Sequence, residues 1–441
     1  MRGMFSDKDL QKVAGECGFY KKKSDFMPTM FFDMLLYCAS QTEACSLEQA
    51  SSMVSNKYRL KISKQAIDER FNNHSVVFVK EILKKALEKQ LSKVFAPLFL
   101  PEFNRIRIKD ATRFNVSDRL SNNYPGAGGS QGSSNATICI QFEYDAKSGK
   151  ILSLDITSGR RNDQTDAKET VTRVDLGDLI IRDLGYYSLP TLKSFDKSGA
   201  FFISRFGTKT NAYEIQEEEI SFKKLYAKMI KEHIPRMEKA IYAGKSERML
   251  LRLIIETVPD KVYQKRIRKI EKNNKLFGYN TSDEYKARCH LNLFITNVKA
   301  EDLSIDEVLN LYRLRWQIEL MFKNWKSISK IDEIQPMKYA RYTCLLNAKL
   351  LLIVINFQII WNLKKYYYAC TGKILSIFKC FMTLHRNFDT LHEILRKKRK
   401  KSEKCLLMIS KLLSVNHWKE KRKNRSNYED LLDLFLCKSN I

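Results

Sequence analysis

The sequence has no pair of cysteines at the spacing that zinc sites use. Its ten cysteines are scattered, its six histidines are dispersed as well, and the two types adjoin only at Cys289 and His290. Adjacent side chains point to opposite faces of a strand, so Cys289 and His290 are poorly placed to share a metal ion. The sequence also offers no further Cys or His near this pair to complete a site. We therefore expect neither zinc ligation nor a disulfide framework, and a reducing cytoplasm fits this use of cysteine.

A secretory signal is also missing, because the first residues, MRGMFSDKDL, contain no apolar stretch. The most apolar run, CLLNAKLLLIVINFQIIW, is interrupted by Asn347, Lys349, Asn356 and Gln358. Four polar side chains in one run favour a buried helix of a soluble protein over a membrane span. We expect a cytoplasmic protein.

Acidic residues are scarce relative to basic ones. The 441 residues include 78 Lys and Arg but only 50 Asp and Glu, which gives a formal net charge of +28. A surplus of this size points to a polyanionic partner; nucleic acid is the commonest, and a membrane surface is the competing interpretation. Hydrophobic residues make up 44% of the chain, which is enough for a sizeable core.

Residues 1–95 are predicted to form an all-α domain, because apolar residues recur there at helical spacing. In the segment YRLKISKQAIDERFN, Ser63 is placed to cap a helix that begins at Lys64. A turn followed by a polar, basic helix, here with Gln65 and Arg70, is how helix-turn-helix units present a recognition helix to DNA. An ordinary amphipathic helix in an all-α domain fits the pattern about as well.

The hydrophobic period changes to two near residue 103. RIRIKDAT alternates and predicts a strand that ends near Asp110. ATICIQFEYDAKSGKILSLDITSG predicts two further strands joined by a turn at 147–149, and DLIIRDLGYYS a short buried strand that ends at Asp183. Three strands followed by alternating helix and strand indicate a mixed α/β sheet. The loop between the first two strands is glycine-rich but lacks a following Gly-Lys-Ser/Thr, so we interpret it as a flexible connection and not as a phosphate cradle.

Four regions follow from this pass along the chain. A helical domain covers 1–95, and the α/β core covers 100–207 and 304–335. A charged insertion at 208–303 interrupts the core; it holds the strand-like pieces RLIIETV and LNLFITNV and the basic run KRIRKIEKNNK. A helical, basic region covers 336–441.

The segment YRLRWQIELMFKNWK contains one acidic residue, Glu319, among four basic ones. We expect it to lie within a helix that begins at the capping box SIDE. The spacings of three, four and seven residues place Tyr312, Arg315, Glu319 and Lys326 on one face of this helix. Taken alone, Arg315 and Glu319 could be an ordinary surface ion pair worth a few tenths of a kcal/mol. Two tryptophans beside this face favour a more buried setting.

Asp110 and Asp183 give this helix a possible function, because each is expected at a strand end of the same sheet. If the strands are neighbours, the two carboxylates share a metal ion and Glu319 completes the site. Two Mg²⁺ ions held in this way activate a water or a 3′-hydroxyl and stabilise the leaving oxygen in phosphoryl transfer. Other acids have simpler explanations: Asp163 and Asp166 precede a helix and are expected to cap it. The acids at 175 and 178 lie at a strand entry.

The spacing Y-x2-R-x3-E-x6-K, matched by Tyr312, Arg315, Glu319 and Lys326, resembles the YREK motif of bacterial insertion-sequence transposases of the DDE type. KDAT and RDLGYYS look like the first and second aspartate motifs of that family, and SKQAIDERFN is similar to its N-terminal helix-turn-helix. The resemblance covers roughly residues 100–365.

This resemblance implies a ribonuclease H-like core with a β-rich insertion between the second Asp and the Glu. It implies Asp110, Asp183 and Glu319 as the catalytic, metal-binding triad for Mg²⁺, with Mn²⁺ able to substitute. DNA contacts would come from the three other YREK residues near the cut, and from Lys64, Gln65 and Arg70 on the terminal inverted repeats. Cut-and-paste transposition of two ends into target DNA implies at least a homodimer.

Alternatives remain open for the base-stacking residue and for the function. Some relatives stack a flipped base on a Trp in the insertion, whereas all four tryptophans here lie outside 208–303. Phe277, Tyr279 and Phe294, or Trp316 and Trp325 near the motif, are possible replacements. A non-catalytic DNA-binding regulator, including a domesticated transposase, would keep the charge and the helix-turn-helix without the triad. A metal-dependent nuclease would cut without joining.

Overall fold

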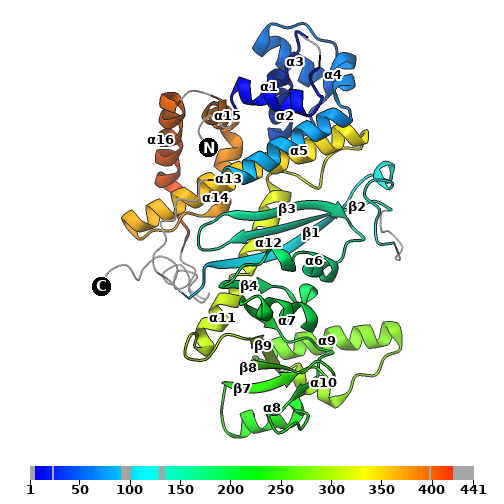
Figure 1. Cartoon of the computed structure of the whole chain (residues 1–441), viewed down its shortest axis with the longest axis vertical. Helices are drawn as coiled ribbons and strands as arrows, with labels where there is room; N and C mark the ends of the chain where they lie inside the picture. The colour runs from blue at the N-terminus through cyan, green and yellow to red at the C-terminus, as the bar shows by residue number, and fades with distance from the viewer. Residues whose placement is uncertain are drawn as a thin grey trace. The chain divides into compact units, whose positions relative to one another are not determined.

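The computed structural model of the chain describes residues 5–21, 24–90, 100, 102–128, 135–396 and 399–420 (Figure 1). It divides into two compact units. Unit 1 comprises 1–99, 111–161 and 318–441, and unit 2 comprises 100–110 and 162–317. Parts of the glycine-rich loop, at 129–134, and most of the last basic run lie outside the described residues.

Unit 1 begins with five helices, as the helical periodicity predicts: α1 (Asp7–Glu16), α2 (Pro28–Ser40), α3 (Leu47–Tyr58), α4 (Lys64–Arg70) and α5 (Asn73–Glu88). Polar caps fix the starts of all but α2, which begins at Pro28; Ser46 and Gln49 form a capping box on α3, and Ser63 accepts a hydrogen bond from the Ala66 amide on α4. The predicted start of α4 at Lys64 is thereby confirmed.

The long helix α13 (Tyr339–Thr371) is the centre of unit 1. It packs against α2 and α5, and Figure 1 shows α5 and α13 side by side. It is the one helix among the described residues that is long and apolar enough to span a membrane, and its apolar stretch is entirely buried inside the protein. The predicted core helix is therefore confirmed. The remaining helices of this unit are α12 (Trp316–Ser327, whose first two residues belong to unit 2), α14 (Ile377–Arg386), α15 (Phe388–Arg396) and α16 (Arg399–Asn416).

The hairpin of β2 (Thr137–Asp145) and β3 (Ile151–Ser158) has the predicted turn between its strands. Gly149 adopts a positive φ of 74°, and an added Cβ would lie 2.0 Å from the ring of Trp361. Its carbonyl accepts a hydrogen bond from the amide of Gln358 at 3.1 Å. This glycine therefore permits both the turn and the close packing of the hairpin on α13.

A buried carboxylate joins α2 to α3 and α15. Asp33 on α2 forms ion pairs with His392 Nε2 at 3.0 Å and Arg396 Nε at 3.1 Å, and accepts hydrogen bonds from Lys57 Nζ at 3.1 Å and from the hydroxyl of Tyr58. Burial would raise the pKa of Asp33, but the hydrogen bonds from His392 and Tyr58 and the charges of His392 and Arg396 outweigh it and lower the pKa to about 2.

Unit 2 is built on a mixed sheet. Its strand order is β1-β4-β5-β9-β8-β7-β6, and β1 continues into unit 1, where the order is β3-β2-β1. β1 pairs with β4, and β4 with β5, in parallel; the later pairs from β5 to β6 are antiparallel. The predicted mixed α/β sheet is confirmed. The strands are β1 (Arg105–Asn115), β4 (Asp178–Arg182), β5 (Phe201–Arg205), β6 (Ala212–Tyr213), β7 (Arg236–Ala243), β8 (Met249–Thr257) and β9 (Leu291–Thr296).

Helices and an apolar core complete unit 2. The core gathers Ile180, Phe202, Leu253 and Ile295 from four strands, with Leu192 from α7. Strands β6 to β9 of the charged segment 208–303 thus extend the sheet that begins with β1, β4 and β5. The helices are α6 (Asp163–Glu169), α7 (Leu189–Lys197), α8 (Phe222–Lys231), α9 (Asp260–Phe277), α10 (Asp283–Arg288) and α11 (Ile305–Arg313), with short 3₁₀ turns at Asp118–Leu120 in unit 1 and at Val171–Arg173 and Leu184–Tyr186 here.

Candidate active site

Asp110 and Asp183 are brought to the same place by the parallel pairing of β1 and β4. The register pairs Ile108 with Ile181 and Lys109 with Arg182, so Asp110 and Asp183 follow at the next step of both strands. Parallel neighbours in register point to the same face of a sheet, and here that face also carries Ile108 and Ile181. The predicted strand end at Asp183 is confirmed, because β4 stops at Arg182.

The predicted end of β1 at Asp110 is wrong. β1 runs on to Asn115, and what ends near Asp110 is its pairing with β4. The reason is that RIRIKDATRFN keeps strand-forming residues beyond the aspartate, and strand β2 is available on the other side of β1. Asp110 therefore lies within a strand, at the residue that follows the last pair with β4.

The opposite face of β1 is basic and is neutralised by buried acids. Arg107 Nη1 lies 3.0 Å from Asp178, and Arg105 Nε donates to the same carboxylate at 2.7 Å. Lys109 and Asp166 form an ion pair in which both side chains are fully buried. The Asp178 contacts fit the predicted place of this residue at the entry of β4.

The capping role predicted for Asp163 and Asp166 is wrong. The cap of α6 is Asn162, whose side chain accepts from the Thr165 amide, and both acids lie inside the helix. Asp166 faces β1, where Lys109 neutralises it. The sequence shows no signal of this pair, because its two residues are 57 positions apart and belong to different elements.

Arg315 contacts both aspartates. Its Nη1 lies 3.2 Å from Asp110 Oδ2 and its Nε lies 3.7 Å from Asp183 Oδ1. Arg315 and Asp110 are largely buried, with 15% and 17% of their side chains exposed, whereas Asp183 is 45% exposed. A guanidinium thus holds together two carboxylates that would otherwise repel each other.

Tyr312 lies beside this cluster. Burial and the charge of Asp183 raise the pKa of its hydroxyl to about 12. Its ring packs edge-on against Phe294 at 5.0 Å, and the Arg315 guanidinium lies 6.0 Å from the ring centre. The phenol is therefore fixed in its neutral form next to Arg315.

The prediction of one continuous helix through the YREK residues is wrong. α11 ends at Arg313 and α12 begins at Trp316. Between them the amides of Leu314, Arg315 and Gln317 bond to carbonyls three residues back, which is the tighter 3₁₀ pattern. The capping box at Ser304 and Glu307, where α11 begins, is confirmed. The break places Arg315 in a turn, so a single helical face does not describe the four residues.

Glu319 and Lys326 belong to α12 in unit 1. Lys326 Nζ donates to the Arg113 carbonyl at 3.0 Å. It also lines an open hollow of about 450 Å³ with Thr112, Phe322 and Lys323. Glu319 is part-exposed in the first turn of the helix.

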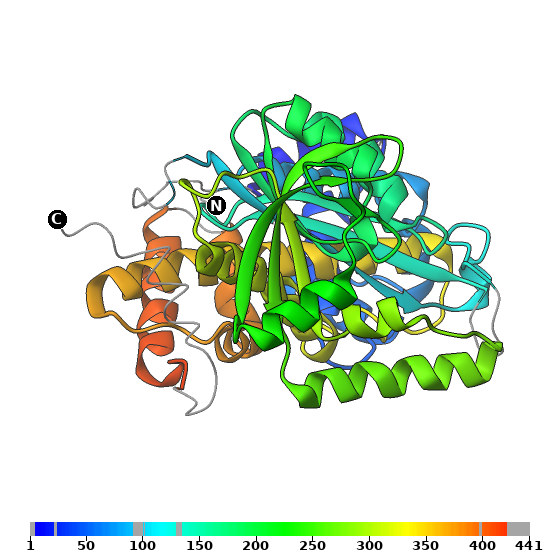
Figure 2. The same ribbon diagram turned by 90° about the horizontal axis from the view of Figure 1, so that it is seen from below.

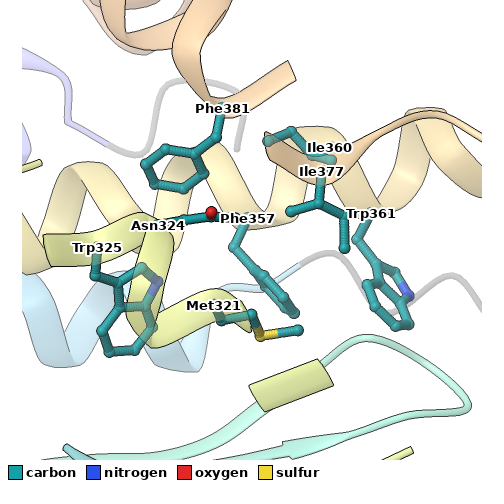
Figure 3. Close-up of a pocket in the computed structure, with 8 residues that line it drawn as sticks. All are labelled: Met321, Asn324, Trp325, Phe357, Ile360, Trp361, Ile377 and Phe381. Atoms are coloured by element: carbon teal, nitrogen blue, oxygen red, sulfur yellow. The ribbon is translucent and has the colours of Figure 1, made fainter. Parts of the chain in front are cut away.

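α12 is held against β2 by aromatic packing. Trp325 is buried against Phe142 and Phe322, at 4.9 and 5.1 Å between ring centres. Figure 3 shows Trp325 with Met321 and Phe357 around a remaining gap of about 10 Å³. A space of this size holds at most about one water molecule, so it is a packing gap and no substrate site.

The structure therefore brings together Asp110, Asp183, Arg315 and Tyr312, all in unit 2, and places Glu319 and Lys326 in unit 1. Within the described ranges, no group of three or more His, Cys, Asp or Glu residues has the arrangement of a metal site. Two carboxylates are nevertheless a sufficient protein contribution for Mg²⁺, which keeps water and substrate oxygens as its other ligands. The donor set of Asp110 and Asp183 fits such an ion.

The helix-turn-helix candidate presents two of its three predicted residues to solvent. Lys64 and Gln65 are exposed at the start of α4, and Lys64 Nζ forms a surface ion pair with Glu48 at 2.8 Å. Arg70 is part-buried and donates to Ser24 Oγ at 2.9 Å. The turn before α4 is fixed by α3, since the Ser51 hydroxyl donates to the Ile62 carbonyl at 2.6 Å.

The aromatic candidates for base stacking differ in exposure. Phe277 and Tyr279 are 59% and 64% exposed and stack on each other at 5.8 Å. Trp316 is 52% exposed, whereas Phe294 and Trp325 are buried.

Residues 101–355 match the family model described as a transposase DDE domain. The chain is 28% identical over 440 residues to the transposase of insertion sequence element IS231B from Bacillus thuringiensis subsp. berliner, an alignment that covers 96% of this chain and 92% of that protein. It is 29% identical over 441 residues to the IS231F transposase of B. thuringiensis subsp. israelensis, with the same coverage. It is 28% identical over 413 residues to the IS1151 transposase of Clostridium perfringens, with 88% and 85% of the two chains covered.

Proposed function

The chain belongs to the transposase DDE domain family, and from this premise we propose that it is a DNA transposase that cuts the ends of its own element and joins them to target DNA. The observation that carries this proposal is the convergence of Asp110 and Asp183 on adjacent parallel strands inside the matched domain. The surplus of basic residues supports a DNA partner.

Asp110 and Asp183 would hold Mg²⁺, or Mn²⁺ in its place, and Glu319 would complete the triad. A divalent ion supplies activation of the attacking oxygen and stabilisation of the leaving oxygen in phosphoryl transfer. The contribution of the chain is to fix both carboxylates. β1 continues past Asp110 to Asn115, its pairing with β4 runs up to Lys109, and the Lys109–Asp166 pair is buried on the other face of the strand.

Arg315, Tyr312 and Lys326 would hold the DNA backbone at the cut. The planar guanidinium of Arg315 suits a pair of phosphate oxygens, and Lys326 acts as a point charge further from the scissile bond. In the absence of DNA, Arg315 contacts the two aspartates instead. The neutral hydroxyl of Tyr312 is a hydrogen-bond donor for a further phosphate.

The helices at 1–95 would bind the terminal inverted repeats through Lys64, Gln65 and Arg70. The first two are exposed at the start of α4. Arg70 would need to leave Ser24 to reach DNA. Two element ends in one reaction imply at least a homodimer in the active complex, and DNA as the substrate places the protein on the nucleoid.

The test is cleavage of a labelled duplex that carries one element end. The wild-type protein is expected to nick it with Mg²⁺, and Asp110→Asn and Asp183→Asn to bind but not nick it, because a neutral amide is a poor ligand for a hard cation. Asp175→Asn is the matched control, since Asp175 is 73% exposed at the opposite end of β4. Normal cleavage by both variants would move the active site elsewhere.

Two alternative functions are separated by the same assay. A non-catalytic regulator would bind the duplex and cut nothing with any metal. A nuclease without joining activity would cut, but labelled ends would not appear in a target plasmid.

A further inference from the structure

Helix α9 presents one anchored face and one free face in unit 2. On the anchored face, the ring of Tyr263 stacks on His290 at 3.5 Å, and Arg266 donates to the carbonyls of Cys289 and Leu291 at 3.0 Å each. None of the 18 residues of α9 is fully buried. Figure 2 shows α9 as the long yellow-green helix at the lower right edge of the ribbon.

The free face carries a stripe of five cations, here called the α9 stripe: Lys261, Lys265, Arg268, Lys272 and Lys275. They are spaced by four, three, four and three residues, so at 100° per residue they lie within an arc of about 80°. The anchored residues Tyr263 and Arg266 lie on the opposite side of the helix. All five cations are exposed.

The α9 stripe lowers the stability of the helix unless a partner neutralises it. Each neighbouring pair along it is a like-charge pair at i,i+3 or i,i+4, which destabilises a helix by roughly 0.2–0.5 kcal/mol. Within the described part of the chain, none of the five forms an ion pair. Other cations of unit 2 do so: Lys239 with Glu214, Arg252 with Glu238, and Arg236 with Glu256. The acids of α9, Asp260 and Glu271, lie beside the stripe and not on it.

We propose that the α9 stripe binds the phosphate backbone of the target DNA duplex. A row of cations that only repel each other is complementary to a row of phosphates. The row spans 14 residues, or about 21 Å, which corresponds to roughly six base pairs along one strand. This proposal rests on the proposed function, which supplies the target.

The chemistry of the stripe favours target DNA over the element ends. Four of its five members are lysines, which neutralise phosphates as point charges and do not recognise a base. The ends must be distinguished from other DNA, and the exposed polar start of α4 suits that task. A target can have any sequence, and a surface made of charge alone binds any sequence.

The experiment compares three full-length variants. The stripe variant changes all five residues of the α9 stripe to Gln, which keeps helix propensity. A charge-retaining variant exchanges Lys and Arg at the same five positions. The matched control removes five exposed cations elsewhere in unit 2: Lys223, Lys224, Lys228, Lys231 and Lys299, each changed to Gln.

Binding to a duplex of random sequence is first measured without metal over a range of salt concentrations. Five phosphate contacts contribute about 4.5 to the slope of log K against log salt. The stripe variant should therefore show a slope that is shallower by about 4.5, while the control and charge-retaining variants keep the wild-type slope. Circular dichroism verifies that α9 remains folded.

Strand transfer then distinguishes the source of the DNA. With pre-cut ends and a target plasmid, the stripe variant should lose at least about tenfold in joining, as the lost phosphate contacts require. Its cleavage of an end duplex should stay within about twofold of wild type. The proposal would be overturned if the stripe variant kept the wild-type salt slope, or if the control variant lost as much slope as the stripe variant. It would also be overturned if the stripe variant lost end cleavage and joining equally. If the wild type neither cuts nor joins, the proposed function fails, and the salt slopes still report whether the stripe binds DNA.

Discussion

Arg315→Gln removes the guanidinium that contacts both Asp110 and Asp183. In the structure Arg315 is 15% exposed, Asp110 17% and Asp183 45%. A charge pair at about 4 Å gains roughly 4 kcal/mol at an effective dielectric constant of about 20, before desolvation is subtracted. Net values run from about 0–1 kcal/mol for exposed pairs to about 3–5 kcal/mol when one partner of a buried pair is lost. Asp183 belongs at the low end and Asp110 between the limits, so we expect about 1–3 kcal/mol for the two contacts together.

This energy opposes metal binding if the metal uses the same carboxylate oxygens. In the wild type a divalent ion must displace Arg315, whereas in Arg315→Gln two facing carboxylates are left with their mutual repulsion. Recovery of about 1.4 kcal/mol corresponds to a tenfold change in affinity, so the variant should bind Mn²⁺ about tenfold more tightly. It should still nick an end duplex but process the second strand poorly, because the phosphate is no longer held.

The measurement is calorimetric titration of the DNA-free, full-length protein with Mn²⁺. Arg313→Gln is the matched control: Arg313 is exposed, contacts Asn310 at 3.0 Å, and loses the same charge two residues away. Asp110→Asn should abolish the binding. Equal affinity of Arg315→Gln and wild type would show that the guanidinium does not compete with the metal. Weaker binding would show that Arg315 helps to build the metal site, and would refute the reasoning.

Three further predictions can be measured independently. Glu319→Ala should prevent the first nick at any metal concentration, whereas Lys326→Ala should nick and then stall; a time course on a labelled end duplex resolves the products, and identical stalling before the nick would contradict separate roles. Lys64→Ala combined with Gln65→Ala should reduce the preference for end DNA over random duplex by about 10–100-fold, if each contact discriminates by about 1 kcal/mol or more; an unchanged ratio in a competition assay would remove α4 from the recognition surface. Asp33, with a folded-state pKa of about 2, contributes stability that is fully present above its ordinary pKa of 3.8 and is lost as the pH falls towards 2; Asp33→Asn should remove about 2 kcal/mol of this acid-sensitive stability, and an acid unfolding curve that retains its wild-type midpoint would argue against it.

Local signals in the sequence predicted the elements that local chemistry determines. Ser63 and the Ser304–Glu307 box mark helix starts because a cap requires nothing more distant than three residues. The alternation of RIRIK predicted β1, and the apolar run that ends before Asp183 predicted β4. The adjacency of these two strands was only a condition of the predicted metal site, because pairing joins segments about 70 residues apart.

The contacts that complete the site depend on residues far apart in the chain. Nothing in KDAT indicates that Lys109 is fully buried against Asp166. The turn at Leu314 and Arg315 contains neither Gly nor Pro, so local propensity favours one helix through it. Because the helix breaks here, Arg315 contacts Asp183 and Asp110, which lie about 130 and 205 positions earlier in the sequence. Only the folded unit brings these carboxylates to Arg315. Packing in three dimensions here outweighs a helical preference of a few tenths of a kcal/mol per residue.

The charges around β1 explain why an acidic site can exist in so basic a protein. On one face of β1, Arg105, Arg107 and Lys109 are compensated by Asp178 and Asp166. On the other face, one guanidinium joins two carboxylates, so this trio carries one net negative charge. A DNA phosphate that approaches the trio is repelled until a divalent cation reverses the sign. Metal binding and DNA binding at this point should therefore be coupled, each strengthening the other, while the phosphates further along the duplex are held by surfaces such as the α9 stripe that need no metal.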